Sequence, residues 1–276
     1  MNIDKKRLAV LTTVLIVVLV PSVLLATTFS ADGIGVTWNG DVYDVETGTL
    51  ISNSGFFGLN GLAEDSQGTI YSVSTPSSLD GSLVTIDPLT GLGTAIADVD
   101  TINGVRGLAF SANDELYSII DTGDPWYIGP DSLATIDTSN GEVTYFGATG
   151  LTGIQGLAFS QDEVLYGWDL GEGLVTIDLL TGVATDVNPE VGGGYIQTLD
   201  FDQYGTLFGG GGSLYEIDLL SGDYSVVDTL GFSGRGIVLQ DGSTPTPTPE
   251  PATIFLFGTG LVGFARVGAR RKKSMM

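Results

Sequence analysis

A short turn pattern recurs five times along this chain, and it limits the possible folds more than any other feature of the sequence. Each copy begins with Asp and ends four residues later with Gly, and successive glycines are 43, 50, 41 and 40 residues apart. The copies are Asp44–Gly48, Asp87–Gly91, Asp137–Gly141, Asp178–Gly182 and Asp218–Gly222. Repeats of about 40–50 residues are typical of arrays in which each unit buries its faces only against its neighbours.

A second signature precedes four of these turns. It reads Gly-Leu-Ala-Phe at residues 107–110 and 156–159, and looser copies stand at residues 61–63 and 198–201. An aromatic residue follows each signature Leu at an offset of nine, in the pairs Leu62 and Tyr71, Leu108 and Tyr117, Leu157 and Tyr166, and Leu199 and Phe208. We expect these aromatic residues to pack between neighbouring units rather than to bind a ligand, because they recur in each unit.

The third copy shows the content of one unit most clearly. Short apolar segments at residues 156–160, 164–168, 174–178 and 183–187 are separated by turns rich in Gly and Asp, which is the pattern of four antiparallel strands. Four strands that recur at this spacing are typical of a propeller blade. The sequence therefore predicts an all-β fold, a β-propeller.

The two ends of the repeat region predict the number of blades. Residues 236–239 look like a fifth first strand with no further strands after them, whereas residues 36–38, 41–45 and 49–52 look like strands two to four of a blade that lacks its first. We expect these segments to combine into a composite closing blade, so that five blades form a ring without exposed edges at a seam. The alternative is an open array, or a ring with poorly marked blades.

The beginning of the chain has the features of an export signal. Three cations at Lys5, Lys6 and Arg7 precede an apolar run over residues 8–20, and Pro21 breaks the run before small residues at 26–31. This order predicts a secretory signal peptide over residues 1–31. An uncleaved N-terminal anchor is the competing interpretation, because the apolar stretch extends to Ala26.

The last residues form a linker, an apolar segment and a basic tail. A Thr/Pro linker over residues 243–251 ends in Pro249, Glu250 and Pro251, and the alternation of Thr and Pro favours an extended chain. Residues 252–265 carry no charge, and five cations follow them at Arg266, Arg270, Arg271, Lys272 and Lys273. This order predicts a transmembrane sorting helix with a basic cytoplasmic end over residues 252–276, and leaves residues 32–242 as the ectodomain.

The tail TPTPTPEPATIFLFGTGLVGFARVGARRKK resembles the PEP-CTERM sorting signal of bacterial surface and matrix proteins. The resemblance implies recognition by exosortase, a membrane-embedded, transpeptidase-like enzyme, and removal of the tail after about Pro249. It also implies that the protein reaches the cell surface or the extracellular matrix, after transient anchoring in the inner membrane of a Gram-negative-type bacterium. The residues that carry the signal are Pro249, Glu250, Pro251, Arg270, Arg271, Lys272 and Lys273.

Charge and composition exclude several classes of function. Only two cations, Arg106 and Arg235, lie between residues 32 and 251, against 32 acidic residues, so this region repels nucleic acid and anionic membrane surfaces. The chain contains no Cys and no His, which excludes disulfides, the usual zinc sites and catalysis that depends on imidazole or thiolate. The ectodomain must therefore be held together by its hydrophobic core alone.

Residues that break the repeat are the better candidates for ligand binding. Trp126 and Tyr127 lie in the longest loop, residues 121–131, and we expect Trp168 and Asp169 in the equivalent loop of the next blade. An aromatic plane beside a carboxylate can bind a sugar by stacking and hydrogen bonding, which makes extracellular polysaccharide the candidate ligand class. The favoured interpretation is that these tryptophans only cover the sheets, because single exposed aromatics need no special explanation.

The repeated turn aspartates Asp87, Asp137, Asp178 and Asp218 allow two interpretations. Asp accepts hydrogen bonds from nearby backbone N–H groups in a turn, and the following Gly supplies a positive φ, so a structural role is sufficient. Ca²⁺ binding is the alternative, although no copy has the dense ligands of an EF-hand loop. No other cofactor is expected.

An enzymatic function is the last alternative. A five-bladed propeller glycoside hydrolase needs only two carboxylates in its channel. The ectodomain offers many, and most of them lie in turns where acids are common for structural reasons: Glu64, Asp65, Asp114, Glu115, Asp162, Glu163 and Asp200. We therefore expect an exported binding or scaffold module, with the hydrolase as the alternative.

Overall fold

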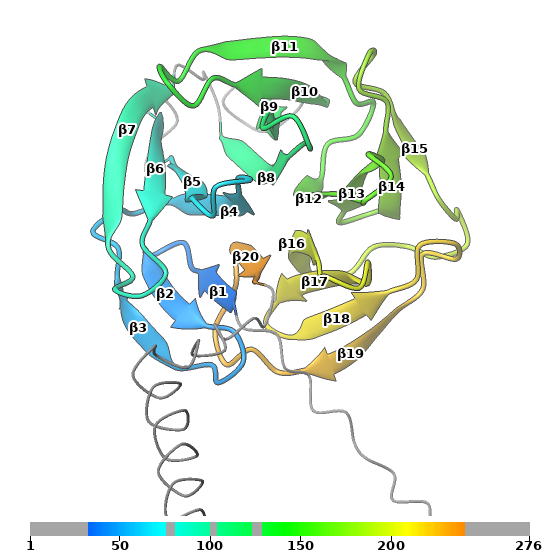
Figure 1. The fold of residues 1–276 in the computed structure, drawn as a ribbon. Coiled ribbons are helices and arrows are strands. Elements are labelled where there is room, and N and C mark those ends of the chain that lie inside the picture. Colours follow the sequence, from blue (N-terminus) through cyan, green and yellow to red (C-terminus); the bar gives the residue numbers. More distant parts are fainter. Residues whose placement is uncertain (1–32, 76–80, 100–103, 123–128, 241–276) are drawn as a thin grey trace, which may run out of the picture.

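The computed structural model describes residues 33–75, 81–99, 104–122 and 129–240, and within them the fold is all-β. Five four-stranded antiparallel sheets stand around a common axis as the blades of a β-propeller (Figure 1). The fold class and the number of blades agree with the prediction from the repeats. Among the described residues, no helix has the length and hydrophobicity needed to cross a membrane. The signal peptide and the sorting helix expected at the two ends lie outside these residues.

The twenty strands form five blades, here named A to E, each with its innermost strand first in the following lists. Blade A contains β20 (Gly236–Leu239), β1 (Gly33–Val36), β2 (Asp41–Asp44) and β3 (Leu50–Asn53). Blade B contains β4 (Leu59–Glu64), β5 (Ile70–Ser74), β6 (Gly81–Ile86) and β7 (Gly93–Val99). Blade C contains β8 (Val105–Phe110), β9 (Leu116–Asp121), β10 (Asp131–Ile136) and β11 (Val143–Ala148).

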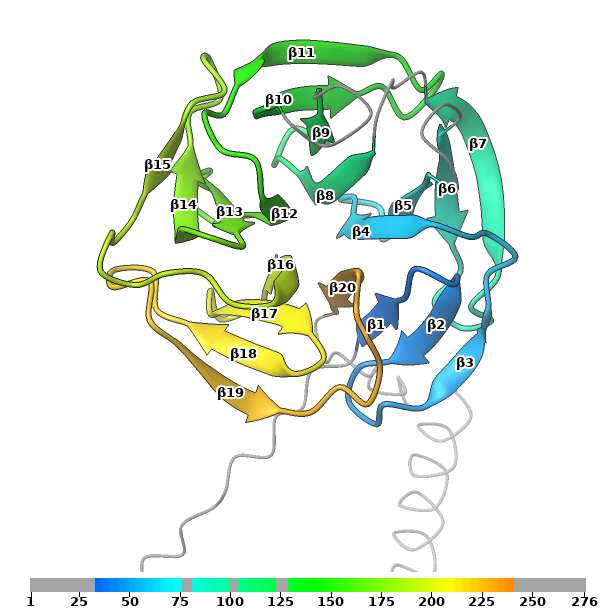
Figure 2. The ribbon, with the colours of Figure 1, turned by 180° about the vertical axis from the view of Figure 1, so that it is seen from behind.

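Blade D contains β12 (Ile154–Phe159), β13 (Leu165–Asp169), β14 (Gly173–Ile177) and β15 (Ala184–Asp186). Blade E contains β16 (Ile196–Phe201), β17 (Leu207–Gly211), β18 (Leu214–Ile217) and β19 (Tyr224–Asp228). In both views along the axis, the first strand of each blade lies nearest the centre and the fourth strand follows the perimeter (Figures 1 and 2).

Blade A closes the ring by joining the two ends of the repeat region. β20 pairs antiparallel with β1, so that Gly33 lies opposite Leu239 and Val36 lies opposite Gly236. The composite blade is thus confirmed, but its second strand is Gly33–Val36 and not residues 36–38. The sequence obscured this strand because two of its four residues are glycines. Gly35 is required there, because a Cβ would lie 2.5 Å from the ring of Phe232.

The glycine of the repeated signature lets the inner strands of adjacent blades touch through their backbones. A Cβ on Gly107 would lie 2.7 Å from Leu157 N, and one on Gly156 would lie 2.6 Å from Leu199 N. Gly61 and Gly236 meet the next inner strand at similar distances, 2.9 Å from Leu108 N and 2.6 Å from Leu62 N. At the fifth position Thr198 replaces Gly, and its hydroxyl accepts a hydrogen bond of 3.0 Å from Ile237 N–H.

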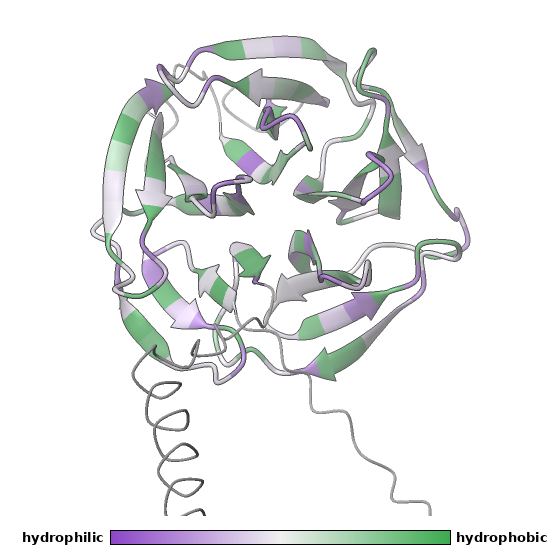
Figure 3. Cartoon of the chain, in the orientation of Figure 1, coloured by the Kyte–Doolittle hydropathy of each residue, from purple (hydrophilic) through white to green (hydrophobic). Residues whose placement is uncertain are grey.

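The other repeated residues fill the space between blades. The signature leucines are buried, and each nine-offset tyrosine of blades B, C and D packs edge to face on the aromatic residue at the end of the next inner strand. The pairs are Tyr71 with Phe110, Tyr117 with Phe159 and Tyr166 with Phe201, with centroid distances of 5.3, 5.3 and 5.9 Å. The expected packing role of the repeated aromatics is therefore confirmed. Hydrophobic residues colour much of the strands, while hydrophilic ones are common in the turns (Figure 3).

We predict that Gly107→Ala destabilises the ring, because the added methyl group must displace the backbone of blade D. Overpacking of this kind costs about 1–3 kcal/mol. Denaturant unfolding should therefore show a lower midpoint with an unchanged slope. Gly212→Ala is the matched control, because a Cβ there meets no atom within 4 Å. Equal midpoints for the two variants would contradict the role assigned to the signature glycine.

Candidate functional site

The ring has two mouths of different chemistry, one at each end of its central channel. The C-terminal ends of all five inner strands meet at one mouth and line a hollow of about 150 Å³. Acidic side chains in or beside the turns that follow these strands surround this end, which we call the acidic mouth: Glu64, Asp65, Asp114, Glu115, Asp162, Glu163, Asp200 and Asp202. The N-terminal parts of the inner strands form the other end, which we call the arginine mouth: Asn60, Arg106, Gln155, Gln197 and Arg235.

Asp200 is the distinctive residue of the acidic mouth. It stands where three of the other inner strands carry the signature Ala, and it lines the hollow together with Glu64. Its Oδ2 accepts a hydrogen bond of 2.7 Å from Leu239 N–H, and its Oδ1 accepts one of 2.9 Å from Phe201 N–H. Burial raises the pKa of Asp200 to about 7 against the lowering effect of these two N–H groups, and the charges of Glu64 and Asp202 raise it further.

Two turn residues of the acidic mouth join neighbouring blades. Asp114 and Glu163 have positive φ angles of 60° and 59°, a conformation that a non-glycine residue rarely adopts. Asp114 accepts hydrogen bonds from the backbone N–H and the hydroxyl of Ser66 in blade B, at 2.9 and 2.6 Å. Glu163 accepts a hydrogen bond of 3.2 Å from Ala112 N–H in blade C. These acids therefore bridge blades, a role that the sequence, which suggested simple solvated turns, did not reveal.

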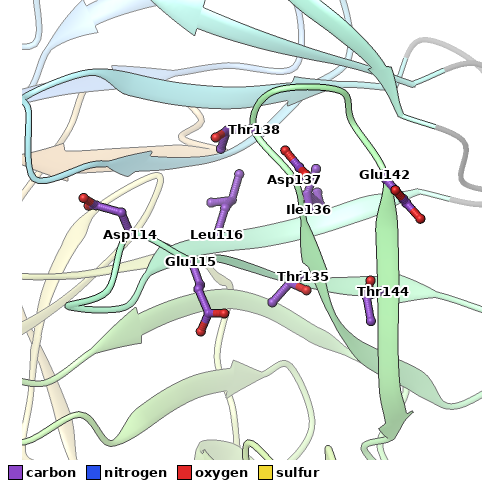
Figure 4. Close-up of a pocket in the computed structure, with 9 residues that line it drawn as sticks. All are labelled: Asp114, Glu115, Leu116, Thr135, Ile136, Asp137, Thr138, Glu142 and Thr144. Atoms are coloured by element: carbon purple, nitrogen blue, oxygen red, sulfur yellow. The ribbon is translucent and has the colours of Figure 1, made fainter.

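A larger hollow of about 400 Å³ lies between the two turns of blade C (Figure 4). Carboxylates and threonine hydroxyls dominate its lining: Asp114, Glu115, Leu116, Thr135, Ile136, Asp137, Thr138, Glu142 and Thr144. Two of the four carboxylates that line the hollow already accept hydrogen bonds within the protein. Asp114 accepts one from Ser66 N–H, and Asp137 accepts one from Ser139 N–H in its own turn. None of the described residues that line this hollow is aromatic or cationic, so this lining offers no group that would orient a sugar or an anion.

The arginine mouth contains an aromatic and cationic group that spans two blades. The guanidinium of Arg235 lies 5.6 Å from the ring centroid of Trp38, and its Nη1 donates a hydrogen bond of 2.7 Å to Gln197 Oε1. Trp38 in turn meets Phe57 edge to face at 5.9 Å. These residues come from the β1–β2 turn, the connection between β3 and β4, the start of β16 and the residue before β20.

Arg106, the other cation of the ectodomain, is neutralised by buried acids. Its Nη2 lies 3.0 Å from Asp121 Oδ2, and its Nη1 lies 3.2 Å from Asp131 Oδ2. Burial raises the pKa of Asp131 to about 7 although Arg106 lowers it, and nearby Asp121 and Asp169 raise it further. Oδ2 of Asp131 also accepts a hydrogen bond from Ile154 N–H, whereas the buried Oδ1 has no hydrogen-bond partner. This network joins blades C and D.

The residues expected to bind a ligand do not form a platform. Trp168 and Asp169 lie in β13 and not in a loop, which corrects the sequence-based placement. Trp168 is 0% exposed, and its Nε1 donates a hydrogen bond to Gly194 O, so neither ring face is open to a sugar. The carboxylate of Asp169 accepts hydrogen bonds from the N–H groups of Gly153, Gly171 and Glu172. Trp126 and Tyr127 lie outside the described residues.

The repeated turn aspartates are occupied by their own turns. Asp178 Oδ1 accepts hydrogen bonds from Leu180 N–H at 3.1 Å and Thr181 N–H at 2.8 Å, and Gly182 has the expected positive φ of 77°. Hydrogen bonds of this kind hold the pKa of Asp87, Asp137, Asp178 and Asp218 below its usual range. The four residues lie in four different blades. Across the described segments, no group of three or more acidic side chains is arranged to hold a metal ion.

The sequence contains a signal for the arginine mouth at the position before each signature glycine. Arg106 and Arg235 each directly precede a signature glycine, and Asn60, Gln155 and Gln197 occupy the same position in the other three blades. The sequence aligns these five positions, but only the closed ring brings them to one mouth. Trp38 and Phe57 had no repeat partner that would have marked them.

The fold and its two mouths define the protein as a five-bladed propeller whose central channel has an acidic mouth at one end and an arginine mouth at the other. Residues 247–272 match the family model of the PEP-CTERM protein-sorting motif. The chain thus carries a motif that indicates export, sorting to the cell surface and processing by exosortase. The sorting residues, from Pro249 to Lys273, lie outside the described part of the chain. No curated protein matches this chain.

Solved structures resemble the chain in fold only. A putative gluconolactonase is 13% identical, with 77% of this chain and 82% of that chain covered and a TM-score of 0.51. A chain of the nidogen/laminin complex is 16% identical, with 76% and 84% covered and a TM-score of 0.50. A protein of unknown function from Bacteroides thetaiotaomicron is 15% identical with a TM-score of 0.48, and the match covers 74% of this chain but only 59% of that one.

We predict that Asp200→Asn removes part of the pH dependence of stability. The folded protein keeps the Asp200 proton up to a pKa of about 7, whereas the unfolded chain loses it near pH 4. The folded state therefore binds more protons between these values, and the free energy of unfolding falls as the pH rises from about 4 to 7. Denaturant unfolding across this range should show a flatter profile for the variant. Asp162→Asn, at an exposed turn position, should keep the wild-type slope.

Proposed function

We propose that this exported protein is a binding module that presents its arginine mouth away from the membrane, at the cell surface or in the extracellular matrix, with polysaccharide as its ligand. The observation that carries the proposal is the position of the two ends of the ring. Gly33, where the described chain begins, pairs with Leu239, one residue before it ends, and both lie at the acidic mouth. The segments that carry the export signal and the sorting motif therefore both leave the ring on the same side.

The linker limits how far the acidic mouth can lie from the membrane. Residues 241–251 precede the apolar segment and reach at most about 40 Å when fully extended. While the tail is anchored, the acidic mouth therefore stays within this distance of the membrane. The arginine mouth lies at the other end of the channel and faces outward, where an external partner meets it first.

The charge of the acidic mouth affects how close the ring lies to the membrane. Its acidic side chains repel anionic lipid headgroups, and at physiological salt this repulsion acts over a Debye length of about 8 Å. The ring is thus held off the membrane surface and not drawn onto it. Pro249, Glu250 and Pro251 then stay accessible to exosortase.

We predict that replacing Pro249, Glu250 and Pro251 together with Ala leaves the tail attached in the native host. Immunoblots should show a product larger than the processed wild-type protein and retained in the membrane fraction. Normal loss of the tail in this variant would refute the sorting role of the motif.

The variant that keeps its tail also serves to test the orientation. The chain has no cysteine, so Tyr204→Cys at the acidic mouth and Glu172→Cys in the β13–β14 turn each give one labelling site on opposite ends of the channel. With the labelled full-length protein in vesicles that contain acceptor lipids, energy transfer should be efficient from position 204 and weak from position 172. Equal or reversed transfer would contradict the proposed orientation.

A glycoside hydrolase is the second candidate function, and Asp200 is the observation that favours it. A carboxyl group with a pKa of about 7 that lines a hollow together with a second carboxyl group, that of Glu64, is suited to act as a general acid. A fold neighbour described as a putative gluconolactonase is consistent with sugar chemistry on this fold, although fold alone carries no activity.

The hydrolase predicts release of reducing ends from polysaccharide by the secreted protein, with loss of activity in Asp200→Asn and in Glu64→Gln. Asp162→Asn, which alters an exposed turn acid, should leave the rate unchanged. The absence of reducing-end release by the wild-type protein would exclude this function for the substrates tested and leave the binding module in place.

A further inference from the structure

We infer that the arginine mouth contains a binding site for an uncharged sugar unit, formed by Trp38, Phe57 and Arg235. The inference deepens the proposed function, because it names the residues and the ligand class at the mouth that faces outward. It replaces Trp168, which is buried, with an aromatic pair that reaches the surface.

The aromatic part of the site is accessible. Phe57 is 50% exposed, and Trp38, its edge-to-face partner, is half-buried. Tyr195, 57% exposed at the start of blade E, adds an aromatic ring near the same mouth, beside Gly211. Aromatic faces of this kind stack on the C–H face of a sugar ring.

Arg235 is held in place but not neutralised. Gln197, which is 3% exposed, accepts a hydrogen bond from its Nη1, and the ring of Trp38 lies under its guanidinium. Arg235 forms no ion pair with any described residue, unlike Arg106, which faces two carboxylates. A guanidinium has five N–H donors, so most of them remain available to ligand oxygens.

The backbone fixes the relative positions of these residues. Arg235 N–H donates to Val36 O at 2.8 Å, and Gly61 N–H donates to Arg235 O at 2.9 Å. Gly58 N–H donates to Trp38 O at 2.7 Å, which ties the turn that carries Trp38 to the segment that carries Phe57. The site is therefore formed before a ligand binds, which lowers the entropic cost of binding.

The inner strand whose backbone contacts Arg235 contains a buried acceptor that has no donor among the described residues. Asn60 precedes Gly61, donates its Nδ2 to Val105 O, and leaves its buried Oδ1 without a hydrogen-bond partner. This oxygen is covered by protein atoms and is not open to a ligand, so the site rests on the Trp38 ring and on the N–H donors of Arg235. Sugar hydroxyls supply acceptors for those donors.

The overall charge selects an uncharged ligand. The ectodomain has 32 acidic residues against two Arg, so an acidic polysaccharide is repelled along most of its length. A single guanidinium does not reverse that repulsion for a polyanion. A neutral hexose polymer meets no such penalty, and it uses both the aromatic faces and the N–H donors.

The test is a glycan array followed by titration calorimetry, with the protein purified in the form that its host secretes. The probes are short gluco-, galacto- and manno-oligosaccharides, with uronate oligomers of matched length. We expect binding to a neutral oligomer, and a loss of affinity of about tenfold or more in Trp38→Ala and in Arg235→Gln. Trp38→Phe keeps an aromatic face and should retain more of the affinity than Trp38→Ala.

Tyr204→Ala is the matched control, because it removes an aromatic residue that is 83% exposed in the β16–β17 turn at the acidic mouth. It should leave the affinity unchanged, and unfolding curves establish that each variant is folded. If the affinity is unchanged in all three variants at Trp38 and Arg235, the proposed site is wrong, although the proposal that the protein is a binding module remains. Binding of uronates alone would overturn the ligand class. Failure to bind any of these probes would overturn the inference, whereas the tail and orientation experiments test the proposed display independently.

Discussion

The direct backbone contact between inner strands is the constraint on which the rest of this molecule depends. Five strands pack around one axis with no side chain between them at the signature glycine, or with only the Thr198 hydroxyl at the fifth position. Because the strands approach so closely, the signature leucines and the aromatic pairs fall at fixed places between blades. Both sequence repeats thus follow from one packing requirement.

The same arrangement gives the two ends of the central channel different side chains. The inner strands all end at the acidic mouth, so residues one position before the signature glycine gather at the other mouth, while turn acids gather at the first. Closure through β20 and β1 then places both ends of the ring at the acidic mouth. The direction in which the strands run therefore places both ends of the described chain at the acidic mouth and the polar residues that precede the signature glycines at the opposite mouth.

Departures from the repeat are more informative about function than the repeat itself. The turn aspartates and the nine-offset aromatics recur, and the structure assigns them to turns and to packing. Asp200 in place of Ala and Arg235 without a carboxylate partner do not recur, and each gives its mouth a distinct chemistry. Trp168 also breaks the repeat but is buried, so an unusual residue in the sequence is informative only once its exposure is known.

The sequence by itself determined the all-β class, the five blades, the composite closure and the sorting motif, because each leaves a periodic or contiguous pattern along the chain. Only the tertiary structure decided which side chains meet. Trp38, Phe57, Gln197 and Arg235 are spread over nearly the whole repeat region of the sequence, and they come together because the last inner strand joins the first blade. Ring closure brings together residues that are far apart in the chain, so no local sequence pattern predicts their contacts.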